Sequence, residues 1–281
     1  MKTDKYAILV NTCDSFEDCW EPFFKLFSIY WPDYERKIYL NTEYKDFVYE
    51  GLNIIPVKGC GKHQFPKTKR ATWSQCLIWA LDAIDSDVVL YMQEDYFLKD
   101  FVKNETVDYY AQLIQAHNDI HCIHLTDQAM QADTTPGKYE NLFLPSPHEK
   151  LPITCQAALW QKTVLRSCLR TYENAWQFEM YGSRRELSSP HNIYNVNPQI
   201  VRLGKFEIVP YIFTGIIKGR WYEEVVPLFE KHGIPIDYHK RGFVNDAPDD
   251  PISKRIKRKF QTFPVWVRYL IEKHVCKPKN R

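Results

Sequence analysis

The feature that most constrains the fold is the stretch VVLYMQEDYFL at residues 88–98, an apolar run that leads into two adjacent carboxylates. Its apolar part has the length and the β-branched and aromatic content of a buried strand. A core strand gains nothing from unpaired charge, so Glu94 and Asp95 need another explanation. In open α/β sheets, ligand and metal sites lie at the carboxyl ends of the strands. The sequence therefore predicts a functional site around Glu94 and Asp95.

Strand-like and helix-like segments alternate along the chain. Helices are expected at residues 15–30, 72–84, 106–117 and 163–171, and further strands at residues 6–10, 36–40, 53–57 and 119–125. This alternation predicts an α/β protein with a mostly parallel, Rossmann-type open sheet and helices on both faces. Residues 134–152 are rich in proline and are expected to form a long loop of the kind that often binds ligands.

From Trp73 to Leu98 the chain reads as helix, short turn, strand and acidic tip. This stretch resembles the donor-side motif of bacterial glycosyltransferases of GT-A fold that assemble surface polysaccharides such as capsule and lipopolysaccharide. Residues 6–15, a strand running into a polar loop, resemble the same group. So does a Q-x-x-x-W … W-x-F-E pattern, made here by Gln156, Trp160, Trp176 and Glu179. One departure is Gln93, which stands where the first Asp of the group's Asp-x-Asp motif would be.

The resemblance implies a GT-A-like catalytic domain over residues 1–251. Its donor half covers about residues 1–130 and its acceptor half about residues 131–251. Residues 252–281 then form a separate basic, amphipathic and aromatic segment. The implied donor is a nucleoside-diphosphate sugar, and the implied acceptor is a glycan or a lipid-linked glycan.

Donor-side roles follow from the resemblance and from the residue types. The loop with Asn11, Thr12 and Asp14 is expected to approach the nucleotide. Asp95, helped by Glu94, can bind Mn²⁺ or Mg²⁺ through oxygen ligands, and one of the two carboxylates is expected to face the ribose or sugar instead. Three further residues are candidates: Lys218 and Arg220 for the diphosphate, between or beside turn glycines, and His239 near the metal, where GT-A enzymes often carry a late histidine.

Glu179 is the candidate catalytic base on the acceptor side. The aromatic residues Trp176 and Phe178 beside it can raise its pKa by desolvation and stack on the acceptor, and Trp160 is a second acceptor-side candidate. The alternative for Glu179 is an ordinary ion pair with Arg184 or Arg185.

Charge is distributed unevenly along the 281 residues. Residues 252–281 carry ten Lys or Arg and a single acid, Glu272, whereas the whole chain has a formal net charge of +2. Net basic charge concentrated in the tail argues against a nucleic-acid-binding body and for attachment to an anionic membrane surface. The alternative is that the tail aromatics pack on the catalytic domain and the charges are solvated.

The eight cysteines are scattered without a C-x-x-C pair, and the first residues have no signal-peptide pattern. We therefore expect reduced, mostly buried thiols and a cytoplasmic protein, attached peripherally to the inner face of the membrane.

These features favour a metal-assisted, inverting glycosyltransferase. A sugar nucleotidyltransferase is an alternative with a similar sheet, although residues 11–15 lack the glycine-rich phosphate loop typical of that class. A non-catalytic protein of degenerate GT-A fold that binds nucleotide sugars or glycans is a third possibility, because the first Asp of the motif is Gln93.

Overall fold

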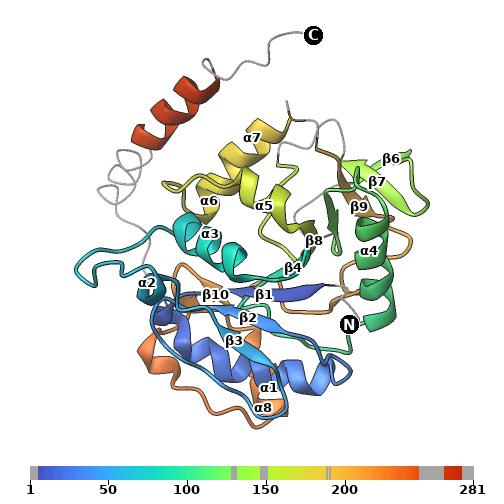
Figure 1. Cartoon of the computed structure of the whole chain (residues 1–281). Helices are drawn as coiled ribbons and strands as arrows, with labels where there is room; N and C mark the ends of the chain where they lie inside the picture. Colours follow the sequence, from blue (N-terminus) through green and yellow to red (C-terminus); the bar gives the residue numbers. More distant parts are fainter. Residues whose placement is uncertain are drawn as a thin grey trace.

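The computed structural model describes residues 6–127, 132–145, 151–187, 189, 191–246 and 263–273. Its centre is a nine-stranded open sheet with the order β3-β2-β1-β4-β8-β5-β9-β7-β6 (Figure 1). The strands are β1 (Ala7–Asn11), β2 (Ile38–Asn41), β3 (Ile54–Pro56), β4 (Val88–Gln93), β5 (Cys122–His124), β6 (Ala132–Pro136), β7 (Leu142–Pro145), β8 (Ala158–Gln161) and β9 (Ile193–Val196). Within this sheet, β7 and β8 run against the direction of the other seven strands. The predicted α/β architecture, a mostly parallel open sheet with helices on both faces, is confirmed.

Helices lie on both faces of this sheet. They are η1 (Asp14–Cys19), α1 (Trp20–Tyr30), α2 (Gly59–Lys62), α3 (Trp73–Ala83), α4 (Asn104–Ala116), α5 (Lys162–Cys168), α6 (Ala175–Gln177), η2 (Phe178–Gly182), α7 (Ser183–Glu186), α8 (Val225–Lys231) and η3 (Tyr238–Lys240). The predicted helix 15–30 is therefore divided into the 3-10 turn η1 and α1. The predicted helix 72–84 is α3, and the Thr72 hydroxyl caps it by accepting from the Gln75 N–H.

Strand alternation divides the core between the two faces. Ile8 and Val10 of β1 pack with residues of α1, α4 and α8, whereas Ala7 and Leu9 pack with residues of α3 and α5. Successive side chains of a strand point to opposite faces, so one strand supplies both cores. Both cores are fully covered, which explains why β1 and β4 read as continuous apolar runs.

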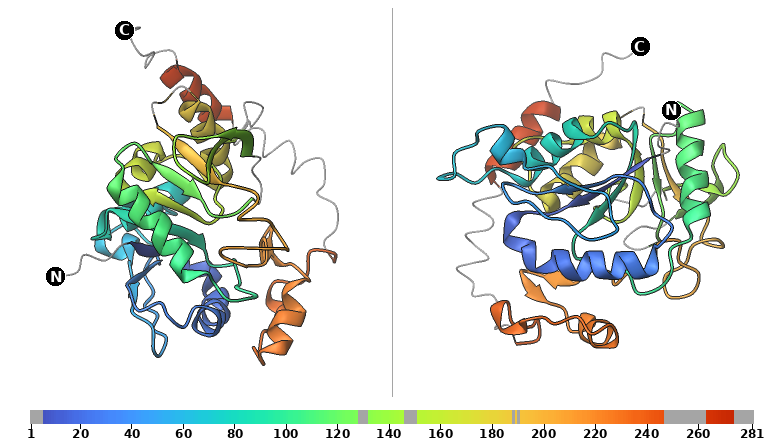
Figure 2. Two further views of the ribbon diagram at one scale, coloured as in Figure 1. Left: turned by 90° about the vertical axis from the view of Figure 1, so that its right-hand side faces the viewer. Right: turned by 60° about the horizontal axis from the view of Figure 1, so that its bottom comes forward.

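The second half of the chain extends the sheet and adds a lower layer. The expectation that residues 134–152 form one long loop is wrong, because this stretch contains β7 and the end of β6, which pair with each other. A short hairpin, β10 (Ile216–Ile217) and β11 (Arg220–Trp221), precedes α8. Figure 2 shows this hairpin and α8 together on the side of the sheet that α1 covers.

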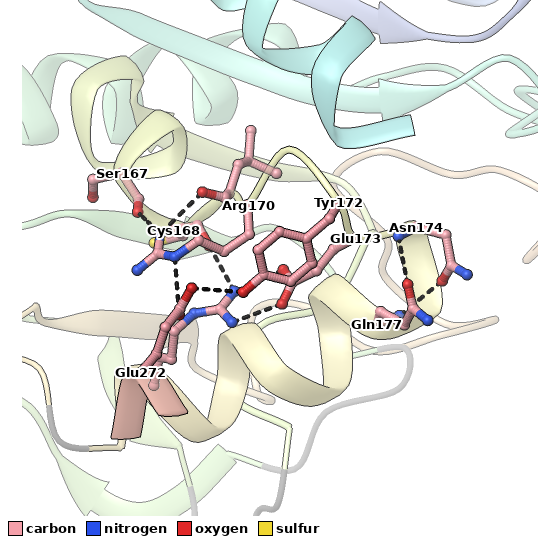
Figure 3. A network of polar contacts seen from close by, with 10 residues as sticks. Ser167, Cys168, Arg170, Tyr172, Glu173, Asn174, Gln177 and Glu272 are labelled. Atoms are coloured by element: carbon pink, nitrogen blue, oxygen red, sulfur yellow. Dashed lines mark hydrogen bonds and ion pairs between the residues drawn. The ribbon is translucent and has the colours of Figure 1, made fainter. Parts of the chain in front are cut away.

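A last helix over residues 263–273 docks on the segment before α6 and on η2. The Glu272 carboxylate accepts hydrogen bonds from the Tyr172 hydroxyl at 2.6 Å and from Arg170 at 3.2 Å, as Figure 3 shows. Tyr269 stacks on Tyr181 with ring centroids 5.0 Å apart. Of the described residues, none form a helix that is long and apolar enough to cross a bilayer. The basic cluster of the predicted tail, at residues 254–259, lies outside the described residues.

Candidate active site

The carboxyl ends of three neighbouring parallel strands meet at one edge of the sheet. The register aligns Asn41 of β2, Asn11 of β1 and Gln93 of β4 across this edge. The amide of Asn41 donates a 2.8 Å hydrogen bond to Oδ1 of Asn11, which fixes the pair. The residues that follow these strand ends, Thr12 and Glu94, are therefore brought together, as the strand-end rule predicts.

Glu94 is a buried carboxylate at the tip of β4. Only 7% of its surface is exposed, and burial raises its pKa well above the ordinary value, with the neighbouring Asp95 adding to the effect. A hydrogen bond from the Thr12 hydroxyl and the positive charge of Arg241 act in the opposite direction. Thr12 is itself fixed, because its hydroxyl accepts a 2.9 Å hydrogen bond from the Trp20 indole.

Asp95 is equally buried but points to a different part of the molecule. Its Oδ2 accepts hydrogen bonds from the Thr214 hydroxyl at 2.6 Å and from the Ile216 N–H at 3.1 Å. Burial is the main cause that raises its pKa, and these donors oppose it. The backbone approaches closely here, since a Cβ on Gly215 would lie 2.2 Å from the Phe97 ring. Asp95 thus holds the β10–β11 hairpin against the end of β4.

The hairpin carries two of the predicted diphosphate residues. Lys218 and Gly219 form its turn, both with positive φ (52° and 80°), the left-handed conformation that tight hairpin turns require. Lys218 is exposed and Arg220 is half-buried. Through Asp95, both residues are tied to the acidic end of β4.

Arg241 is a residue that sequence reasoning missed. Its guanidinium forms an ion pair with Asp18, lies 4.4 Å over the Phe16 ring, and is close enough to Glu94 to lower the pKa of that carboxyl. His239, the predicted metal-side histidine, is exposed, and its backbone N–H bonds to Asp237. The basic group that faces the acidic tip is therefore Arg241 and not His239. In the sequence, the indication of a basic group here was the short run of residues 239–241, which contains both His239 and Arg241.

Asp14 joins two loops at this edge of the sheet. Its two carboxylate oxygens accept from the backbone N–H groups of Glu43 at 2.8 Å and Tyr44 at 3.0 Å. In return, the Asp14 N–H donates to the Glu43 carboxylate at 3.2 Å. This reciprocal pair connects the loop after β1 to the loop after β2.

Glu179 lies in η2, which follows the capping box of Asn174 and Gln177. One of its oxygens, Oε1, accepts a 2.7 Å hydrogen bond from the Cys155 N–H. Burial raises the pKa of Glu179, as the aromatic surroundings predicted. Glu94 and Glu179 each raise the pKa of the buried Tyr91 hydroxyl. The predicted base and the acidic tip are therefore both near enough to Tyr91 to act on its hydroxyl.

The two predicted acceptor-side tryptophans differ in accessibility. Trp176 is 78% exposed, three residues from Glu179. Trp160 is 1% exposed and belongs to the core between the sheet and helices α3 and α5. The expectation that Trp160 contacts an acceptor is wrong, because position 160 faces inward on β8. The alternative ion pair for Glu179 is also not formed with Arg185, which binds Glu173 instead.

No protein-family model matches this chain, and no curated protein matches it in sequence. It is similar in structure to glucosyl-3-phosphoglycerate synthase from Mycobacterium tuberculosis in complex with Mn²⁺ and UDP-glucose, with 11% identity over 82% of this chain and 79% of that chain, and a TM-score of 0.45. A CMP:2-keto-3-deoxy-manno-octonic acid synthetase complexed with CTP has 12% identity over 82% of this chain and 98% of that chain, and a TM-score of 0.45. An active-site mutant of LgtC has 12% identity over 69% and 74%, and a TM-score of 0.36.

Proposed function

We propose that this protein is a glycosyltransferase that moves a sugar from a nucleoside-diphosphate sugar to a glycan or lipid-linked glycan. The observation that carries the proposal is the pair of adjacent, buried carboxylates, Glu94 and Asp95, at the carboxyl end of β4. Burying two neighbouring acids is costly unless their charge is paired, hydrogen-bonded or neutralised by a cation. Their position at the edge where three parallel strands end is the position of ligand chemistry in open α/β sheets.

The residues present suit a hard divalent cation. Carboxylate oxygens are the donors that Mg²⁺ and Mn²⁺ prefer, and burial raises the pKa of both acids, so a bound cation would favour their ionised forms. Glu94 is the more available ligand, because Oδ2 of Asp95 already holds Thr214 and Ile216. A cation bound there would neutralise the diphosphate of the donor.

The remaining roles fall to side chains around this edge. Thr12 and the adjoining loop border the nucleotide. Lys218 and Arg220 are proposed to contact the diphosphate, because the hydrogen bonds from Thr214 and Ile216 to Asp95 hold their hairpin at the end of β4. Arg241 supplies a further positive charge near Glu94. Preorganised positive groups stabilise the charge that develops on a leaving diphosphate.

Glu179 is the proposed general base in an inverting reaction. Its Oε1 is held by the Cys155 N–H, so Oε2 is the oxygen proposed to take the proton from the acceptor hydroxyl. The acceptor oxygen then bonds to the anomeric carbon, and the electron pair of the broken C–O bond leaves with the nucleoside diphosphate. Trp176, exposed beside Glu179, offers a flat face on which a sugar ring can stack.

The C-terminal helix is the proposed attachment to an anionic membrane surface, where a lipid-linked acceptor of a surface polysaccharide would be found. Its docked side carries Val265 and Tyr269. Its outer side exposes Phe263, Trp266 and Ile271, which lie within one apolar stripe at helical spacing. Exposed aromatic residues beside a basic segment suit the interface of an anionic bilayer.

Product analysis tests the proposal and separates its rivals. The protein is incubated with Mn²⁺ and a panel of nucleoside-diphosphate sugars, or with nucleoside triphosphates together with sugar phosphates, and the released phosphate species are identified. A glycosyltransferase releases nucleoside diphosphate with an added acceptor, whereas a nucleotidyltransferase releases pyrophosphate from a triphosphate. Pyrophosphate release, or donor-induced thermal stabilisation without any turnover across the acceptor panel, would overturn the proposal in favour of one of the two alternatives.

A further inference from the structure

Two cysteines from two separate helices lie beside one carboxylate near the proposed donor edge. Cys13 follows β1, Cys60 lies in α2 and Cys76 lies in α3, and Glu43 follows β2. The ligand atoms of Glu43, Cys60 and Cys76 all lie within 4.8 Å of one another. The negative charge of Glu43 also raises the pKa of all three thiols. The sequence contains no C-x-x-C motif that would predict this group, because only the fold brings these segments together.

The environment of the two inner thiols is closed and acidic. Cys60 is 1% exposed and Cys76 is 7% exposed, and the two thiols hydrogen-bond to each other. Apolar neighbours enclose them, including Tyr44 and Trp79. The Glu43 carboxylate beside these thiols adds a third potential ligand atom of a type that binds metals.

We propose that Glu43, Cys60 and Cys76 form a structural zinc site. The fourth position of the tetrahedral site is left for a water molecule or for a movement of Cys13, whose thiol lies outside this group. Thiolate sulfur and carboxylate oxygen both bind Zn²⁺, and sites rich in cysteine select it over the hard cations that suit Glu94 and Asp95. The ligands must lose their protons on binding, so uptake of the metal releases protons and strengthens as the pH rises.

A second group within the described residues also combines three metal-binding types, namely Cys168, Glu186 and His191. There the carboxylate already lies between two partners, with His191 Nδ1 at 2.7 Å and Cys168 Sγ at 3.3 Å. These two hydrogen bonds already satisfy the Glu186 carboxylate. At Glu43, by contrast, the carboxylate accepts from a neutral donor, the Asp14 N–H, and lies beside two thiols, so this group gains more from a cation.

The proposed site would fix the loops that follow β1, β2 and β3. Glu43 and Asp14 are already joined by the reciprocal backbone bonds described above. Cys60 lies in α2, at the start of the basic segment of residues 59–70, and Cys76 lies in α3, so a shared metal would tie that segment to α3. The inference is independent of the transferase activity, since it concerns the stability of these loops and not the reaction.

Metal binding by the full-length chain tests the inference. The reduced protein, stripped by a chelator, is titrated with Zn²⁺ alone and, in parallel, with Co²⁺ alone, whose thiolate complexes absorb through sulfur-to-metal charge transfer. We expect one tightly bound equivalent, a thiolate band with Co²⁺, and a rise in Tm with Zn²⁺. Cys60→Ser and Cys76→Ser should each weaken binding by more than the roughly 10–100-fold that loss of an outer-shell partner costs. Glu43→Gln should weaken binding while keeping the thiolate band.

Two control variants test whether Zn²⁺ binds at the Glu43 group and not at another site in the molecule. Cys168→Ser leaves the Glu43 group intact and should bind Zn²⁺ like the parent, and Glu94→Gln should do the same because the acidic tip is a separate site. Circular dichroism of each metal-free variant checks that it is folded, and Glu43→Gln serves where a cysteine variant does not fold. The inference is overturned if binding is lost in Cys168→Ser, if Co²⁺ binds without a thiolate band, or if non-reducing mass spectrometry finds a Cys60–Cys76 disulfide with no metal uptake by the reduced protein.

Discussion

The Thr214 hydroxyl donates a 2.6 Å hydrogen bond to Oδ2 of Asp95, a residue 119 positions earlier in the chain. The Ile216 N–H donates to the same oxygen, so the acidic end of β4 holds the β10–β11 hairpin in place. Asp95 can therefore have two distinct roles. It can position the hairpin that carries Lys218 and Arg220, and it can also bind a cation directly.

Thr214→Val tests the positioning role of Asp95. The change keeps the side-chain shape and removes one hydrogen bond to a buried charged group, worth about 1.5–3 kcal/mol. We expect weaker donor binding, measured by calorimetry, and a lower unfolding free energy in urea. Ser167→Ala, which removes a hydroxyl bond in α5, is the control and should leave donor binding unchanged.

Asp95→Ala should abolish turnover and weaken metal-dependent donor binding far more than Thr214→Val does. Alanine at position 95 removes a proposed metal ligand together with both hydrogen bonds that hold the hairpin, whereas valine at position 214 removes only one of these hydrogen bonds. The measurement is the Mn²⁺ dependence of donor binding and rate for both variants. Equal effects of the two variants would restrict Asp95 to positioning, and full activity of the parent in EDTA would reject the metal site.

Glu179→Gln should lower the rate of transfer by about 10²–10⁴-fold while donor affinity stays near that of the parent. The amide keeps the shape of the side chain and its bond to the Cys155 N–H but cannot take a proton. The parent rate should also rise with pH through a pKa above the ordinary glutamate value, because burial raises the pKa of Glu179. Rates come from initial velocities and affinity from calorimetry.

Glu173→Gln is the matched control for that experiment. Glu173 is a buried acid of the same segment that pairs with Arg185 at 2.7 Å. Its loss should reduce stability but leave the rate per folded molecule unchanged. A comparable loss of rate in both variants would assign Glu179 a structural role.

Glu94→Gln should stabilise the metal-free protein at neutral pH although it removes activity. The folded state raises the pKa of Glu94 above 4.5, so the folded protein binds more protons than the unfolded chain. The unfolding free energy must then fall as the pH rises from about 4.5 through the raised pKa. Each unit of that rise corresponds to about 1.4 kcal/mol.

Thermal unfolding across pH, with and without Mn²⁺, measures this effect. In the variant, stability should fall less steeply above pH 4.5 than in the parent, and Mn²⁺ should raise the Tm only slightly. A variant that is less stable than the parent throughout this range would mean that the carboxylate is favourably paired within the folded protein.

Phe263→Ser combined with Trp266→Ser should reduce binding to anionic vesicles. Both side chains are exposed on the outer side of the last helix, so their loss leaves the docking by Tyr269 and Glu272 intact. Co-sedimentation with vesicles should fall with salt and vanish when residues 252–281 are removed. Equal sedimentation of the truncated and full chains would reject the membrane role.

Several features could be predicted from the sequence because they depend on short segments. The apolar run of β4 and the carboxylates after it predicted a strand with a functional end. The helix predicted over residues 72–84 lies within one residue of α3 at each end, because its cap residue Thr72 and its apolar spacing are local. The alternation of strands and helices was enough to predict the confirmed open sheet.

Tertiary structure alone decided which side chains face the proposed site. Trp160 is buried because β8 lies between β4 and β5 with helices over that face, and no local pattern distinguishes this from an exposed tryptophan. Arg241 reaches Glu94, and Thr214 reaches Asp95, across more than a hundred residues of chain. The grouping of Cys60 and Cys76 around Glu43 likewise depends on how three loops pack. Such contacts follow from the packing of whole elements, so residue type and spacing do not determine them.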